Sequence, residues 1–172
     1  MIKAAETTQG CHEAAEQVND LAVDALDNVR RLAFELRPKA LDDFGLDAAL
    51  SRLAERLNEL GGVKVDLEVQ LDERLDPDVE SALYRMVQEA LTNVMKHADA
   101  TRASVQVSCN DGMAIAVVED DGVGFETAEA AAGGFGLVAM RERLNLLRGD
   151  LDVESAPGRG TTLRASIAVA ES

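Results

Sequence analysis

Three polar side chains recur at helical spacing in the segment EALTNVMKHA. Glu89, Asn93 and His97 stand four residues apart, so they share one face of the expected helix. Lys96 lies beside them. A carboxylate in such a row can orient or deprotonate an acceptor group, an amide oxygen can bind Mg²⁺, and a cation can contact phosphate. A solvated polar face could have the same residue types, but this order favours a magnesium nucleotide.

A second candidate follows the apolar run that ends at Asp120. Gly122 and Gly124 continue it in the form D-x-G-x-G. The carboxylate can accept a hydrogen bond from an exocyclic amine such as that of adenine, and the glycines let a ring approach the backbone. A plain glycine-rich turn is the alternative interpretation of this short pattern.

Two further glycine motifs come later in the chain. GGFGL, residues 133–137, precedes an expected helix, where free N–H groups and the helix dipole form an anion site. GRGTT, residues 158–162, is the last. A flexible joint and a tight hairpin turn are the respective alternatives. The chain has neither a P-loop pattern nor the third glycine of a dinucleotide fingerprint, which excludes those two kinds of nucleotide site.

The elements that must position these residues are helices and strands in roughly equal number. Apolar residues at steps of three and four predict helices at residues 11–37, 46–60, 77–97 and 137–149. Asp76 is expected to cap the third helix, and KALDDFG to form a short connection before the second. Alternation of apolar and polar residues predicts a strand at 63–69 and hairpins at 102–120 and 150–170. This order indicates an α+β fold in which one antiparallel or mixed sheet carries helices on one face.

Composition narrows the class of protein. The 172 residues can form one domain with an appendage. The net charge of −15 repels nucleic acid and anionic membranes, so neither is an expected partner. Cys11 and Cys109 lack a metal-binding spacing, and no apolar stretch approaches the roughly 20 residues of a membrane span. We therefore expect a cytoplasmic domain with reduced thiols.

Taken in order, the four motifs resemble the ATP-binding domain shared by histidine kinases, DNA gyrase, a heat-shock chaperone and mismatch-repair ATPases. ELRPKALDDFGLDAAL, residues 35–50, and GFGLVAMRERL, residues 134–144, are similar to the nitrate-sensor-like branch of sensor histidine kinases. The resemblance implies a two-layer α/β sandwich with a mixed, mostly antiparallel sheet and its helices on one face. It also implies that a long helix from a dimerisation domain precedes this sandwich.

The same resemblance divides the chain into three parts. Residues 1–37 would be the second helix of a dimerisation domain, and residues 38–62 a connecting segment with the first helix of the catalytic domain. Residues 63–172 would be the ATP-binding catalytic domain itself. The loop at about residues 126–135 would be a lid that closes over nucleotide.

The resemblance also implies roles for individual residues. Asn93 would bind Mg²⁺, and Glu89 would activate an acceptor histidine. The residues expected to bind or line the ATP site are Asn93, Lys96, His97, Asp120, Gly122, Gly124, Gly134, Gly136, Leu137 and Thr161.

The implied activity is transfer of the γ-phosphoryl group of Mg·ATP to a histidine on the dimerisation domain of a homodimeric parent protein. A response-regulator aspartate would then receive it. His12 does not fit the acceptor pattern of this branch, so the acceptor is expected outside this chain and the fragment alone should not autophosphorylate.

Two alternatives to this activity stay open. A serine/threonine kinase of the anti-sigma-factor type has no need for the LRPKALDDFGL segment. A nucleotide-gated interaction module without catalysis has no need for Glu89 and Asn93.

Overall fold

The structure is a computed structural model that describes residues 39–126 and 135–169. The helix expected at residues 11–37, the proposed lid, His12 and Gly134 therefore lie outside the described residues, apart from the ends of the lid. The described elements are, in order, α2 (Lys39–Leu60), β1 (Lys64–Gln70), α3 (Pro77–Asn93), η1 (Val94–Ala98), β2 (Arg102–Asn110), β3 (Met113–Asp120), α5 (Phe135–Leu146), β4 (Asp150–Ser155) and β5 (Thr161–Ala168). Within these two ranges, no helix has both the length and the apolarity to cross a bilayer.

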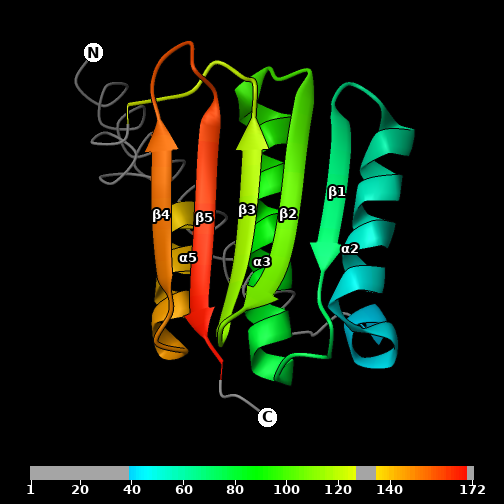
Figure 1. The fold of residues 1–172 in the computed structure, drawn as a ribbon. Coiled ribbons are helices and arrows are strands. Elements are labelled where there is room, and N and C mark those ends of the chain that lie inside the picture. Colours follow the sequence, from blue (N-terminus) through cyan, green and yellow to red (C-terminus); the bar gives the residue numbers. More distant parts are fainter. Residues whose placement is uncertain (1–38, 127–134, 170–172) are drawn as a thin grey trace, which may run out of the picture. The chain divides into compact units, whose positions relative to one another are not determined.

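The five strands form one mixed sheet in the order β1-β2-β3-β5-β4. β1 runs parallel to β2, and every other neighbouring pair is antiparallel. Figure 1 shows the helices on one face, with α3 and α5 behind the sheet and α2 beside β1. The α+β fold with a mixed, mostly antiparallel sheet is thus confirmed.

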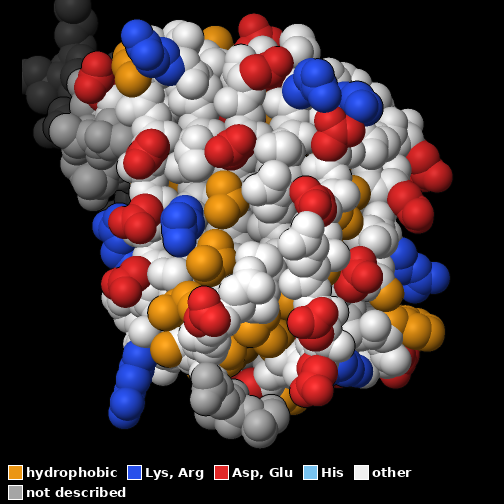
Figure 2. All heavy atoms as spheres, in the orientation of Figure 1, with side chains coloured by type: hydrophobic (Ala, Val, Ile, Leu, Met, Phe, Trp, Pro, Cys, Tyr) orange, Lys and Arg blue, Asp and Glu red, His pale blue; other side chains and the backbone are white. Residues whose placement is uncertain are grey.

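Both predicted hairpins are present. The β2–β3 turn has positive φ at Asp111 (50°) and Gly112 (70°), which matches the twist of an antiparallel pair. In the second hairpin, β4 and β5 pair from Ser155 opposite Thr161. The face of the sheet that the helices do not cover is toward the viewer in Figure 2. It carries scattered acidic groups around a smaller group of hydrophobic side chains.

The core lies between the sheet and the helices. Alternate residues of each strand point inward, and three alanines at the centre of the sheet, Ala114, Ala116 and Ala165, have no exposed surface. Leu83 and Met86 of α3 are equally buried. Because these alanines are small, α3 can lie close to β3 and β5, which it contacts. This packing sets the position of the helix that carries Glu89 and Asn93.

The predicted short connection KALDDFG is wrong, because the segment is helical. α2 begins at Lys39 and is interrupted at Gly45 (φ 83°, ψ 179°), while Leu41 and Leu46 on either side are fully buried. The guanidinium group of Arg74 donates to the carbonyl oxygen of Leu41 (2.9 Å). It also pairs with the buried carboxylate of Glu80 (2.8 Å). Arg74 is remote in sequence, so local periodicity could not reveal this support.

The predicted third helix is confirmed at its start and modified at its end. The Asp76 carboxylate accepts a hydrogen bond from Asp78 N (2.8 Å), as a capping residue should, and Pro77 is the first helical residue. The last turn, η1, is a π-helix that ends at Asp99, whose φ is 49°. The prediction of one continuous α-helix to His97 is therefore wrong for residues 94–98, where the helix is of the wider π type.

Replacing Gly45 with alanine is expected to lower the free energy of unfolding by about 1–3 kcal/mol, because its backbone angles are nearly exclusive to glycine. Urea denaturation of the two proteins measures the difference. Asp43→Ala, at an exposed position in the same helix, is the matched control and should have little effect. An unchanged unfolding midpoint for Gly45→Ala would show that the break can relax without cost.

Candidate functional site

Asp120 is the last residue of β3 and lies opposite Thr161, the first residue of β5. Its half-buried carboxylate accepts a hydrogen bond from Gly122 N (2.8 Å). Burial raises the pKa of the Asp120 carboxyl above its ordinary value, although hydrogen bonds from Gly122 and Thr161 act in the opposite direction. The sheet thus brings together the second and fourth motifs around one carboxylate, which keeps further acceptor positions for a ligand amine.

The two glycines after Asp120 meet protein atoms on the side where a Cβ would stand. A Cβ on Gly122 would collide with the carbonyl oxygen of Ala98 and lie 2.7 Å from the Ala98 Cβ. A Cβ on Gly124 would collide with the carbonyl oxygen of Ala156. Close packing of this loop between η1 and the β4–β5 turn therefore requires both glycines. The sequence alone predicts another use for these glycines, which is to let a ligand ring approach the backbone.

Ser155 at the end of β4 joins this loop to the fourth motif. Its Oγ accepts from Phe125 N (2.9 Å) and donates to the carbonyl oxygen of Gly160 (2.9 Å). It also lies 3.1 Å from Thr161 Oγ1. No sequence pattern indicated this residue, because its hydrogen bonds depend on strand pairing and not on spacing within a motif.

Glu89 is brought next to the third motif. It is half-buried on α3, and a Cβ on Gly136 in the first turn of α5 would lie 2.6 Å from Glu89 Oε1. Leu137, the next residue, is partly buried and packs against the core. α3 and α5 are therefore in contact at the residue expected to act in catalysis.

Two arginines near Glu89 were not predicted. Arg85 on α3 is 8% exposed and donates through Nη1 to Gln88 Oε1 (2.8 Å). Burial lowers the pKa of the Arg85 guanidinium, and so does the positive charge of Arg143 on α5. Burial also lowers the pKa of Arg143, while the Glu89 carboxylate raises it. The sequence could not identify this group, because it depends on the packing of α5 on α3.

Asn93, Lys96 and His97 stand at the end of the same helix. Asn93 is half-buried in the last turn of α3, and the basic side chains of Lys96 and His97 are exposed on η1. The carbonyl oxygen of Ala98 accepts from Val123 N (2.7 Å), so η1 directly contacts the loop after Asp120. The segment after Asp120 is therefore directly connected to the helical turn that carries the two basic residues.

The residues present fit a magnesium ion bound together with a nucleotide better than a metal ion bound by protein side chains alone. Within the described ranges, no group of three or more His, Cys, Asp and Glu side chains could hold a metal ion. Magnesium needs few protein ligands when phosphate oxygens and water complete its shell. Glu89 and Asn93 supply oxygen donors one helical turn apart, both partly accessible.

Comparison with known proteins agrees with this geometry. The family model of the histidine kinase-, DNA gyrase B- and HSP90-like ATPases matches residues 78–171. The signal transduction histidine-protein kinase/phosphatase DegS of Brevibacillus brevis is 39% identical over 165 residues, which is 94% of this chain and 43% of that protein. The oxygen sensor histidine kinase NreB of Staphylococcus carnosus is 34% identical over 159 residues, 91% of this chain and 46% of that protein. The chain thus spans less than half the length of these relatives.

Solved histidine kinase structures share the fold. The histidine kinase domain of the blue-light activated kinase of Erythrobacter litoralis EL346 has a TM-score of 0.56 at 27% identity, covering 72% of this chain and 61% of that domain. The Acinetobacter baumannii histidine kinase AdeS has a TM-score of 0.61 at 14% identity, covering 90% and 82%, which concerns the fold alone.

The chain belongs to the family of histidine kinase-, DNA gyrase B- and HSP90-like ATPases, as its motifs predicted. Its matched residues form an ATP-binding domain of the kind found in histidine kinases. The roles of its individual residues remain predictions.

Asp120→Asn is expected to weaken ADP binding by about 1.5–3 kcal/mol, because it replaces a charged hydrogen-bond acceptor by an amide. Isothermal titration calorimetry measures the change. Asp152→Asn, on the exposed edge strand β4, is the control and should bind as the parent does. Equal affinities for Asp120→Asn and the parent would remove Asp120 from the adenine site.

Asp120 is also expected to make stability depend on pH. Because its folded-state pKa lies above the ordinary 3.8, the folded chain holds this proton more tightly than the unfolded chain does. The stabilisation from this proton is complete below the unfolded pKa and is lost as pH rises through the folded pKa. Asp120→Asn should therefore melt at a higher temperature than the parent at neutral pH, by a margin that shrinks toward about pH 4. Thermal melts followed by circular dichroism test this, and a margin independent of pH would contradict it.

Proposed function

We propose that this domain transfers the γ-phosphoryl group of Mg·ATP to a histidine on a dimerisation domain of the same parent protein, in the cytoplasm. A response-regulator aspartate would then receive the group. The observation that carries the proposal is the contact between the Asp120 loop and η1, because it joins a candidate base-reading carboxylate to basic residues on one continuous surface. The names of the two relatives, both histidine kinases, support it.

Nucleotide binding would use both ends of this surface. Asp120 would accept a hydrogen bond from the exocyclic amine of adenine, beside Gly122, Gly124 and Thr161. Lys96 and His97 would face the phosphates. Magnesium held through Asn93 would neutralise charge on the transferring phosphoryl group. A positively charged η1 in a chain of net charge −15 favours such local anion binding.

Phosphoryl transfer would use Glu89. Its carboxylate would accept a hydrogen bond from one N–H of the incoming imidazole, which leaves the other ring nitrogen with a free lone pair for attack at phosphorus. The bond between phosphorus and the ADP oxygen would break as the phosphorus–nitrogen bond forms, and Glu89 would accept the imidazole proton. Gly136 lies directly against Glu89, and its lack of a side chain leaves that carboxylate accessible. Catalysis would otherwise depend on positioning.

The domain organisation that we propose follows from the same resemblance. Residues 1–37 would belong to the dimerisation domain of a homodimer, and residues 63–172 to the catalytic domain. The segment between them would connect the two. In the described part of that segment, Leu41, Leu46 and Leu50 share the core of the catalytic domain.

The proposal is tested by supplying the parent protein's dimerisation domain separately, with radiolabelled ATP. The unsubstituted chain should transfer the label to a histidine of that domain. Glu89→Gln should slow labelling roughly 10²–10⁴-fold, the range for loss of a general base, without a matching loss of ADP affinity. Asn93→Ala should bind ATP equally well with and without Mg²⁺, as titration calorimetry would show.

Glu142→Gln, exposed on α5, is the matched control and should transfer phosphate at the rate of the unsubstituted chain. Labelling of serine or threonine in a partner protein instead of histidine would favour an anti-sigma-factor-type kinase. Tight ATP binding with no transfer in any pairing would favour an interaction module. Either result would contradict the proposal.

A further inference from the structure

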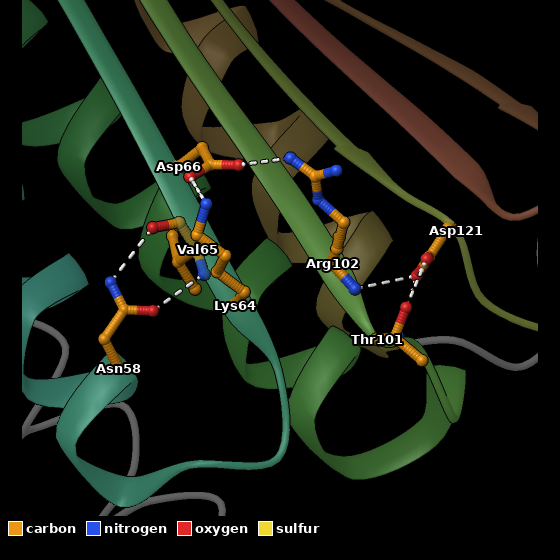
Figure 3. Close-up of polar contacts among 7 residues, drawn as sticks. All are labelled: Asn58, Lys64, Val65, Asp66, Thr101, Arg102 and Asp121. Carbon is orange, nitrogen blue, oxygen red and sulfur yellow. Dashed lines mark hydrogen bonds and ion pairs between the residues drawn. The ribbon is translucent and has the colours of Figure 1, made fainter.

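The two aspartates that end β3 have different surroundings. The Asp120 carboxylate accepts from Gly122 N. The Asp121 carboxylate instead bonds to Thr101 and Arg102 at the start of β2, as Figure 3 shows. Asp121 Oδ1 accepts from Thr101 N (2.8 Å) and Arg102 N (2.9 Å). Its Oδ2 accepts from Thr101 Oγ1 (2.6 Å). One carboxylate therefore takes three donors, and hydrogen bonds to an ionised acceptor are the stronger kind.

The residues that Asp121 holds lie just after η1. Thr101 is three residues beyond Ala98, and between them Asp99 has a left-handed backbone conformation. On the other side of the contact, Val123 N donates to the Ala98 carbonyl oxygen (2.7 Å) and Asp121 N donates to the Arg102 carbonyl oxygen (3.3 Å). The loop after Asp120 is thus attached to the segment after η1 at several successive points.

Asp120 and Asp121 point to opposite sides of the backbone, as successive residues of an extended chain do. Asp120 is paired on both sides of β3, with Ala103 and Thr161, and its carboxylate accepts from Gly122 N. The hydrogen bonds of Asp121 therefore fix the backbone immediately beyond Asp120. The hydrogen bonds from Thr101 and Arg102 also lower the pKa of Asp121, so it stays ionised.

The start of β2 is held in turn by the neighbouring strand. Arg102 pairs with Asp66 of β1 (2.9 Å), and Asp66 pairs with Lys64 (2.8 Å). The Asn58 side chain of α2 bonds both backbone groups of Val65, at 2.8 and 3.0 Å (Figure 3). The exposed ion pairs contribute little by themselves. They connect the position of Thr101 and Arg102 to the sheet edge.

We propose that Asp121 is a positioning residue for the nucleotide site, which holds the end of β3, where Asp120 lies, at a fixed distance from η1. The base-reading carboxylate and the phosphate-facing residues then keep the spacing of one nucleotide. This inference rests on the role given to Asp120 in the proposed function.

The test compares ADP with inosine diphosphate, which has a carbonyl oxygen in place of the adenine amine. Titration calorimetry gives the ratio of the affinity for ADP to the affinity for inosine diphosphate. This ratio measures how strongly Asp120 selects adenine. Partial unfolding weakens both nucleotides equally and leaves the ratio unchanged. Asp121→Ala should lower the ratio about tenfold, because a misplaced Asp120 loses most of a charged hydrogen bond.

Asp121→Asn should recover most of the ratio, since its amide oxygen can accept from both backbone N–H groups and its NH₂ can donate to Thr101 Oγ1. Glu119→Ala, exposed two residues earlier on β3, is the matched control and should keep the parent's ratio. If Asp121→Ala does not fold, Asp121→Ser takes its place, because the short hydroxyl cannot serve all three donors.

The outcomes separate this inference from the proposed function. A parent chain that binds ADP and inosine diphosphate equally would contradict the role of Asp120, and with it the inference. A parent that prefers ADP, with the preference lost in Asp120→Asn but kept in Asp121→Ala or Asp121→Ser, would overturn the inference alone.

Discussion

The close packing of α3 against the centre of the sheet is the constraint on which the site depends. Three fully buried alanines on β3 and β5 leave room for the helix, and Leu83 and Met86 fill the layer between. With α3 at this depth, its final π turn meets the loop after β3, and Ala98 contacts both Gly122 and Val123. A larger side chain at any of these alanines would move the helix and separate the two halves of the site.

The charge distribution of the domain is uneven in a way that suits its ligand. The chain as a whole is acidic, yet Lys96, His97, Arg85 and Arg143 lie on or beside the α3–η1 helix. Arg85 is buried and Arg143 half-buried, so their charges are partly removed from water, which lowers the pKa of both guanidinium groups. Placing charge in such surroundings costs free energy, and the cost is commonly met at sites where the charge acts on a ligand.

The aspartates and glycines of the DDGVG segment also have roles within the protein that their residue types alone do not suggest. The glycines of the D-x-G-x-G pattern were interpreted as access for a ring, but Gly122 and Gly124 are required where the loop packs on other backbone. Of the two aspartates, Asp121 is engaged by Thr101 and Arg102, and Asp120 is the one that we propose to bind the ligand. The loop can present one carboxylate to a ligand because the other is used within the protein.

For the described part of the chain, the sequence by itself determined most of each helix, both hairpins, the sheet with helices on one face and the family. These follow from periodicity, turn residues and short motifs, which act over a few residues of chain. Only the tertiary structure decided the helical start of α2, the π turn and the hydrogen bonds of Ser155 and Asp121. Phe125 and Ser155 are 30 residues apart, and Thr101 and Asp121 are 20 apart. Such contacts depend on which strands pair and how closely α3 packs, and no local pattern encodes either.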